Sequence, residues 1–249
     1  VESILPVRLD LPEELIVPSA AVVIVMDTSG SMGLRVLGGS RTQQEIANEG
    51  AAIAIRSLDK NDLVGVIQFD NTASVVVPVQ RAGDTEAIAR EVLSLSPGGG
   101  TNLPPALREA WDQLRSVEAQ VKHVIVLSDG RSQDAERIPF IAEQMLQKDG
   151  IRVSAISVGD LADVSGMNAM AKMGGGTSYV VSDPATLPRL FLKAVQVIRT
   201  PMIREKPFVP VVRDAQGHVT GFGGATDGEP LVLIGETEGH LGASIYLRE

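Results

Sequence analysis

One uninterrupted apolar segment sets the strongest limit on how this chain can fold. It is Ala-Ala-Val-Val-Ile-Val-Met at Ala20–Met26, and Asp27 follows it directly. Its β-branched residues favour a strand, and a run without alternating polar positions is typical of a strand that is buried on both faces. The run is far shorter than the roughly 20 apolar residues of a transmembrane helix. We therefore predict the central strand of a sheet that is covered on both sides.

Further strand-like and helix-like segments alternate along the chain. Apolar runs predict strands at Leu63–Phe69, Ala73–Val79, His123–Leu127, Ile151–Val158 and Ser178–Val181. Apolar residues spaced by three and four predict amphipathic helices over Ile46–Leu58, Leu103–Leu114, Ile138–Met145 and Leu187–Ile198. This alternation predicts an α/β fold, a doubly wound and mostly parallel sheet with helices on both faces. The short link Asp70–Thr72 is typical of a hairpin, so one edge strand should be antiparallel.

The two ends of the chain differ in character from this central part. Alternating apolar residues between Leu5 and Leu11 predict a short strand, so residues 1–19 are expected to be a leading strand and a connector. Residues 20–200 are expected to form the α/β domain. Residues 201–249 are rich in proline and glycine and are expected to be a β-rich tail or the start of a further domain. Its two β-like runs are Leu231–Ile234 and Ala243–Leu247.

Composition argues against several classes of function. The 249 residues carry a formal net charge of −9, which opposes binding to nucleic acid. The absence of cysteine excludes disulfides, thiolate zinc sites and cysteine nucleophiles. The chain begins with Val1 and shows neither a signal peptide nor a membrane-spanning segment. We therefore expect a soluble piece of a longer protein that does not itself insert into a membrane.

Side chains with oxygen donors follow two of the predicted strands. Asp27, Ser29 and Ser31 come directly after the first strand, Thr101 follows three consecutive glycines, and Asp129 comes after the fourth strand. In a doubly wound sheet the first and fourth strands are neighbours where the winding reverses, and ligands bind at that point. Two carboxylates and three hydroxyls suit Mg²⁺, with Mn²⁺ or Ca²⁺ as alternatives, and suit zinc poorly. The sequence therefore predicts a site for a hard cation.

Such a ligand set leaves the cation with excess positive charge and with open or water-filled positions. A cation in that state attracts an anion from outside. We therefore expect a protein partner that presents an Asp or Glu side chain to the metal.

Each of these residues also has a structural interpretation. Ser29 or Ser31 could cap a helix, Asp129 could be a turn residue before Gly130, and the glycines before Thr101 could be a plain connector. The occurrence of all five at the ends of the right strands favours the metal site.

The main enzymatic alternative is a haloacid-dehalogenase-type phosphatase, whose first strand also ends in an aspartate. Those enzymes need a second aspartate two residues further on as general acid, and this chain has Ser29 there. It also lacks the Gly-x-Ser-x-Gly elbow and the Gly-x-x-x-x-Gly-Lys phosphate loop. His123, His218 and His240 share no triad or metal-binding spacing. We expect no enzymatic activity.

The Asp-x-Ser-x-Ser motif at Asp27, the threonine at Thr101 and the aspartate at Asp129 together resemble the metal-ion-dependent adhesion site of von Willebrand factor A (vWA) domains. The resemblance covers about 200 residues in chain order and is to bacterial vWA proteins tethered to the membrane. It implies a Rossmann-like fold. It also implies that Ser29 and Ser31 bind the metal directly, that Thr101 does so when a partner is bound, and that Asp27 and Asp129 act mainly through water.

Three functions stay open at this point. The resemblance favours metal-dependent protein binding within a membrane-associated bacterial assembly. A cytoplasmic vWA module that works with an AAA-type ATPase in metal-enzyme maturation is the alternative, and a structural domain with an unused metal site is the third. The loop Leu34–Arg41 is longer than in many relatives and is expected to shape the choice of partner. Gly228–Leu231 resembles the start of a glutamine-amidotransferase-like region, but without cysteine that activity is not implied.

Overall fold

The computed structural model describes residues 20–36, 40–130, 132–158, 162–181 and 186–199, together with 212–213 and 219–220. The chain divides into two compact units, one of which is Ser19–Thr200. In the other unit, the described residues form two short antiparallel strands, β7 (Val212–Arg213) and β8 (Val219–Thr220). The expected strands at Leu5–Leu11, Leu231–Ile234 and Ala243–Leu247 lie outside the described residues, as does Gly228–Leu231.

Six strands form the sheet of the larger unit, in the order β3-β2-β1-β4-β5-β6. Their bounds are β1 Ala20–Asp27, β2 Leu63–Phe69, β3 Ala73–Arg81, β4 Val121–Ser128, β5 Ile151–Val158 and β6 Gly175–Val181. Neighbouring strands are parallel except for β2 and β3, which form the predicted antiparallel hairpin. Strand β1 is buried over its whole length, and the winding reverses between β1 and β4. The mostly parallel, doubly wound sheet that the sequence predicts is confirmed.

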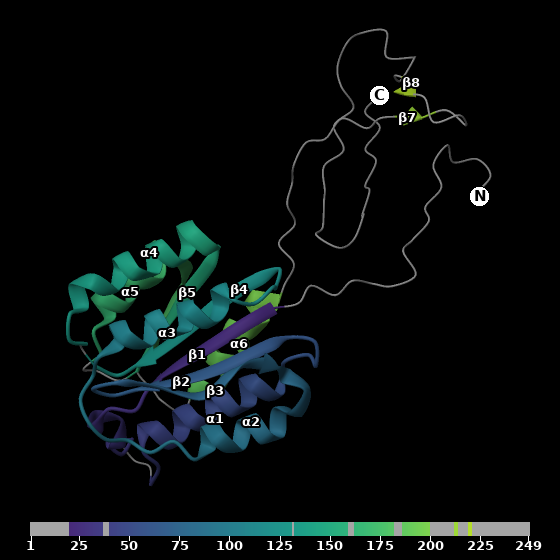
Figure 1. Cartoon of the computed structure of the whole chain (residues 1–249). Helices are drawn as coiled ribbons and strands as arrows, with labels where there is room; N and C mark the ends of the chain where they lie inside the picture. The colour runs from purple at the N-terminus through teal and green to yellow at the C-terminus, as the bar shows by residue number, and fades with distance from the viewer. Residues whose placement is uncertain are drawn as a thin grey trace, which may run out of the picture. The chain divides into compact units, whose positions relative to one another are not determined.

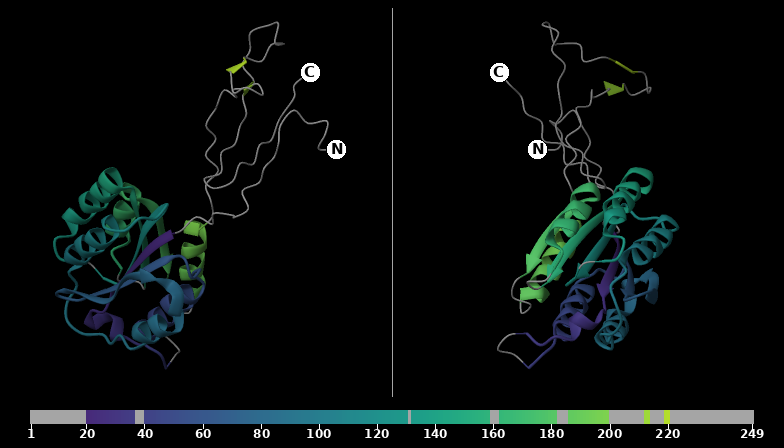
Figure 2. Two further views of the ribbon diagram at one scale, coloured as in Figure 1. Left: turned by 45° about the vertical axis from the view of Figure 1, so that its right-hand side comes forward. Right: turned by 90° about the vertical axis from the view of Figure 1, so that its left-hand side faces the viewer.

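Helices cover both faces of this sheet (Figures 1 and 2). Helices α1 (Gln43–Arg56), α2 (Thr85–Leu93) and α6 (Leu187–Arg199) contribute to the core on one face. Helices α3 (Leu103–Arg115), α4 (Ile138–Asp149) and α5 (Val164–Met173) contribute to the core on the other face.

The sequence analysis missed α2 and α5. Both helices are short, and each buries only three side chains: Ile88, Ala89 and Val92 in α2, and Met167, Met170 and Ala171 in α5. Such short stripes give a weak helical period. Each helix starts at an aspartate whose side chain accepts a backbone N–H, Asp84 from Ala87 and Asp163 from Gly166. These caps were the signal that could have identified the two helices.

Both edge strands of the sheet are irregular. Strand β3 contains Pro78, which has no N–H, and its register with β2 shifts between Val64 and Ile67. The register of β6 with β5 shifts near Val153, where Gly175 has a φ of 65°. A Cβ atom on Gly176 would lie 2.2 Å from the carbonyl oxygen of Val153, so a larger residue does not fit there.

His123 links three strands inside the core. Its Nε2 lies 2.8 Å from Ser154 Oγ on β5, and the same oxygen accepts a hydrogen bond from the Thr177 N–H on β6. Burial and, to a smaller extent, the nearby positive charge of Arg152 together lower the pKa of His123 to about 3. The imidazole is therefore neutral throughout the ordinary pH range.

We expect His123 to make folding less favourable as the pH falls from 6.5 toward about 3. In this window the unfolded chain binds a proton that the folded protein excludes, so the free energy of unfolding falls by up to ~1.4 kcal/mol per pH unit. Urea unfolding of wild type and His123→Asn between about pH 4.5 and 7 measures the effect as a difference. The free energy of unfolding of the variant, relative to that of wild type, should rise as the pH is lowered. If this difference does not change with pH, His123 is not the buried neutral group described here.

Candidate metal centre

Asp27 ends β1 and is completely buried. Its Oδ1 accepts a hydrogen bond from the Ser29 N–H at 2.8 Å, and its Oδ2 accepts one from Ser128 Oγ at 2.5 Å. Burial raises the pKa of Asp27, and the hydrogen bonds from Ser128 and Ser29 oppose that rise. The carboxylate therefore joins the turn after β1 to the end of β4.

Three further oxygens converge next to this carboxylate. Ser29 Oγ lies 3.1 Å from Ser31 Oγ, and Ser31 Oγ donates a hydrogen bond of 2.8 Å to Asp129 Oδ1. Ser29 and Asp129 are buried, and Ser31 is partly exposed. The pKa of Asp129 is raised to about 6, mainly by burial; the hydrogen bond from Ser31 acts against the rise, and the charge of Asp27 contributes to it. The site thus holds a carboxylate that is costly to keep charged without a cation.

Thr101 reaches the same place from the loop between α2 and α3. This loop is tied to the turn after β1, because the Gly98 N–H donates to the Thr28 carbonyl at 2.6 Å and the Gly30 N–H donates to the Gly99 carbonyl at 3.1 Å. A Cβ atom on Gly130 would lie 3.8 Å from Thr101 Oγ1. Thr101 therefore lies beside the loop that carries Asp129, and the structure brings together all five residues that the sequence singled out.

Gly99 explains why the loop before Thr101 is rich in glycine. It has a φ of 80°, and a Cβ atom on it would lie 2.9 Å from Asp70 Oδ2. The left-handed backbone and the close approach to Asp70 both require glycine at this position. Gly99 is therefore part of the site's framework and not a residue of a plain connector.

Ser128 is the residue of this site that the sequence analysis missed. It lies one residue before Asp129, and its hydroxyl donates to Asp27 Oδ2. The parallel register pairs Met26 with Leu127, which places Asp27 and Ser128 side by side at the ends of β1 and β4. The signal that could have identified Ser128 is its position on the same strand face as Asp27, but this needs the register of two strands.

Hydroxyl oxygens must supply part of the shell if a metal binds here. Among the described residues, no three His, Asp or Glu side chains are grouped closely enough to hold a metal ion by themselves. Within that same part of the chain, none of the helices is both long and apolar enough to cross a membrane.

A family model for the von Willebrand factor type A domain matches residues 21–193, from the start of β1 into α6. The chain belongs to the von Willebrand factor type A family. The match covers the whole six-stranded sheet of this vWA domain, and its strand order and helix layers give the Rossmann-like fold.

Curated relatives of this vWA domain are distant. An uncharacterized protein of Synechocystis sp. is 25% identical over 175 residues, which cover 70% of this chain and 40% of that protein. The chain therefore spans less than half the length of that relative. A stretch of 30 residues is 70% identical to phosphoribosylformylglycinamidine synthase subunit PurL of Caulobacter vibrioides, covering 12% of this chain and 4% of that protein. A match of that length carries no activity over.

Solved structures share the fold. A von Willebrand factor type A protein from Catenulispora acidiphila has a TM-score of 0.67 at 24% identity, over 78% of this chain and 46% of that one. An aerotolerance-related membrane protein from Bacteroides fragilis has a TM-score of 0.61 at 19% identity, over 72% of this chain and 99% of that one. Proximal thread matrix protein 1 from the mussel byssus has a TM-score of 0.63 at 18% identity, over 74% of this chain and 46% of that one. That structure is described with a zinc-occupied MIDAS motif, the metal-ion-dependent adhesion site.

Proposed function

We propose that this vWA domain binds a divalent cation through Ser29, Ser31 and Thr101, with Asp27 and Asp129 acting mainly through water, and that a carboxylate of a partner protein completes the shell. The observation that carries the proposal is the convergence of three side-chain oxygens. Ser31 Oγ lies 3.1 Å from Ser29 Oγ and 2.8 Å from Asp129 Oδ1. These oxygens fit a hard cation, because they are hydroxyl and carboxylate donors without nitrogen or sulfur.

Electrostatics support a bound cation. Asp27 and Asp129 are both buried, and burial raises the pKa of each. A cation beside them would offset the cost of keeping both carboxylates charged, whereas without one they repel each other. Mg²⁺ is the proposed ion. The zinc-occupied MIDAS motif of the mussel protein makes Zn²⁺ the competitor to measure against it.

The geometry favours binding over catalysis. Both carboxylate oxygens of Asp27 accept hydrogen bonds from the protein, and the side chain is fully buried. A nucleophile would need a free and accessible oxygen. The likeness to an aerotolerance-related membrane protein supports a place in a membrane-associated bacterial assembly over the ATPase-linked alternative.

Calorimetric titration with Mg²⁺, Mn²⁺ and Zn²⁺ tests the proposal. Wild type should bind one Mg²⁺ per chain, and the double variant Ser29→Ala/Ser31→Ala should lose at least about 100-fold in affinity. Ser116→Ala is the matched control, because the hydroxyl of Ser116 is exposed and caps the end of α3. Mn²⁺ in the site should also speed the relaxation of water protons, and added acetate should reduce that effect if a carboxylate takes an open position. Equal metal affinity in wild type and double variant would refute the site.

Ser128→Ala is expected to weaken Mg²⁺ binding by about 10- to 100-fold. The Ser128 hydroxyl orients the carboxylate of Asp27 through the hydrogen bond of 2.5 Å that it donates to Asp27 Oδ2. Ser157→Ala is the matched control: Ser157 is fully buried and pairs with Ser128 across the sheet, but its Oγ has no hydrogen-bond partner. Ser128→Thr keeps the hydroxyl and should restore affinity. The titration that measures wild type also measures these variants, and equal losses in the Ser128 and Ser157 alanine variants would show a general packing effect.

A further inference from the structure

Exposed apolar side chains gather at one edge of the domain. Among the described residues, the exposed large apolar side chains are Leu34, Val75, Leu93, Phe140, Val164 and Val180. Leu34 follows the turn after β1, Leu93 ends α2, and Phe140 and Val164 lie in the first turns of α4 and α5. These four element ends lie at the carboxyl edge of the parallel strands, which is the edge that carries the candidate metal centre. Val75 and Val180 lie in the two edge strands.

Among the described residues, Leu34 is the exposed large apolar residue nearest in the chain to the proposed ligands. It comes three residues after Ser31, and 53% of it is exposed. Its N–H donates to the Ser31 carbonyl at 2.9 Å, and its own carbonyl accepts from the Gln43 N–H at 3.0 Å. The backbone of Leu34 is therefore fixed on both sides, while its side chain adds little to the core.

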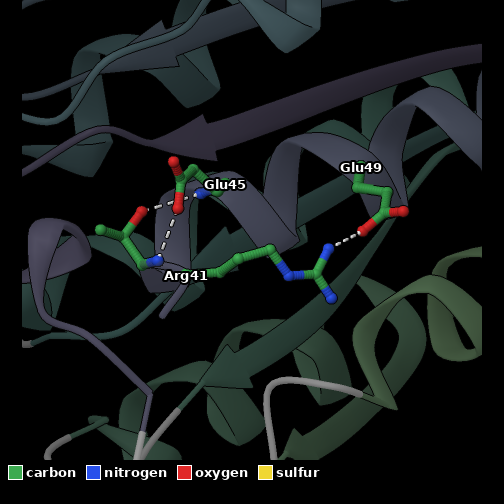
Figure 3. Close-up of polar contacts among 4 residues, drawn as sticks. Arg41, Glu45 and Glu49 are labelled. Atoms are coloured by element: carbon green, nitrogen blue, oxygen red, sulfur yellow. Dashed lines mark hydrogen bonds and ion pairs between the residues drawn. The ribbon is translucent and has the colours of Figure 1, made fainter. Parts of the chain in front are cut away.

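The residues that the structure describes between Leu34 and α1, which are 35–36 and 40–42, are also held by contacts. Arg35 and Thr42 form an isolated antiparallel bridge. Thr42 and Glu45 form a capping box, with 2.7 Å from the Thr42 N–H to Glu45 Oε2 and 3.1 Å from the Glu45 N–H to Thr42 Oγ1, and Arg41 forms an ion pair with Glu49 (Figure 3). Because these contacts hold the backbone that carries Leu34, docking against it costs little conformational entropy.

We propose that Leu34 is a specificity-determining residue of the metal centre, and that the partner presents an Asp or Glu with a large apolar side chain within a few residues of it. This inference rests on the proposed function, since the metal supplies the attraction for the acid. The net charge of −9 repels acidic proteins at a distance, and a metal alone would accept any accessible carboxylate. The exposed leucine beside Ser31 adds a short-range apolar contact, which distinguishes one acidic segment from another.

The experiment is a selection of peptides with the 249-residue chain. A displayed library of random 12-residue peptides is bound in the presence of Mg²⁺ and released with EDTA, using wild type, Leu34→Ser and Val180→Ser in parallel. Val180 is the matched control, because it is 55% exposed but lies in the edge strand β6. Peptides released from wild type and from Val180→Ser should contain an acidic residue with an apolar neighbour. Those from Leu34→Ser should keep the acid and lose the apolar preference.

The affinity of one selected peptide then gives the size of the effect. Leu34→Ser should weaken its binding about tenfold, as expected for burial of the exposed half of a leucine, and Val180→Ser should change it less than about twofold. Equal affinities for wild type and Leu34→Ser, or peptide pools of the same composition, would overturn the role of Leu34 while leaving the metal centre intact. If EDTA releases no peptide from wild type, the proposed function itself fails and the inference with it.

Discussion

Asp27→Asn is expected to remove most of the stabilisation that Mg²⁺ gives to this domain. A ligand that binds only the folded state adds about 2.7 kcal/mol at 100 times its dissociation constant. For a domain of this size that corresponds to a rise in melting temperature of roughly 5–10 °C. The substitution removes one negative charge from the site and replaces an acceptor of the Ser128 hydrogen bond with an amide group. Thermal unfolding with and without Mg²⁺ measures the loss.

The same variant should fold well without metal. Burial raises the pKa of Asp27, so the charged carboxylate costs free energy in the folded state and a neutral amide of similar shape does not. Asp134→Asn is the matched control, because it removes the same charge from an exposed residue whose φ of 50° an asparagine tolerates. The Asp134→Asn variant should keep the full rise in melting temperature that Mg²⁺ gives to wild type. A shift in Asp27→Asn equal to that of wild type would mean that the cation binds elsewhere.

Phe191→Ala is expected to destabilise the domain by about 3–5 kcal/mol. Phe191 is fully buried in α6, and its ring lies against α1 where Gly50 leaves space: a Cβ atom on Gly50 would lie 2.9 Å from the ring. Removing the ring leaves a cavity between two helices that can collapse only in part. The midpoint and slope of urea unfolding measure the loss of stability.

Phe140→Ala is the matched control for this prediction. Phe140 is 60% exposed in the first turn of α4, so the same change of side chain should alter stability by less than about 0.5 kcal/mol. Similar losses in the two variants would show that α6 is not packed on the domain as described.

The sequence predicted the sheet well because its central strand is an uninterrupted apolar run and the other strands each contain a short apolar run. Ala20–Met26 has no polar residue that could set a helical stripe, and the structure extends this strand only by Asp27. Helix α1 was predicted from Ile46 to Leu58, yet it begins at Gln43 and ends at Arg56. Its start is set by the capping box of Thr42, which apolar spacing does not reveal.

The candidate site was predictable as a set of strand ends but not as a hydrogen-bonded arrangement. Asp27 and Asp129 follow strands that the topology rule places side by side. The topology rule does not place Thr101, because the position of its loop depends on backbone hydrogen bonds from Gly98 and Gly30 that join two loops distant in the chain. Ser128 was missed because its role depends on the register of β1 and β4, and register comes from the packed sheet and not from one strand's composition.

The irregular edges of the sheet bear on how copies of this domain behave at high concentration. A regular edge strand offers a row of free N–H and C=O groups on which another chain can add, and such addition leads to aggregation. Pro78 removes a donor from β3, and the shifts of register near Val64 and near Val153 distort the strands at both margins. A second copy of the domain therefore finds no regular edge strand to pair with on either side of the sheet. Crowding at a surface would then bring these domains close together without fusing their sheets.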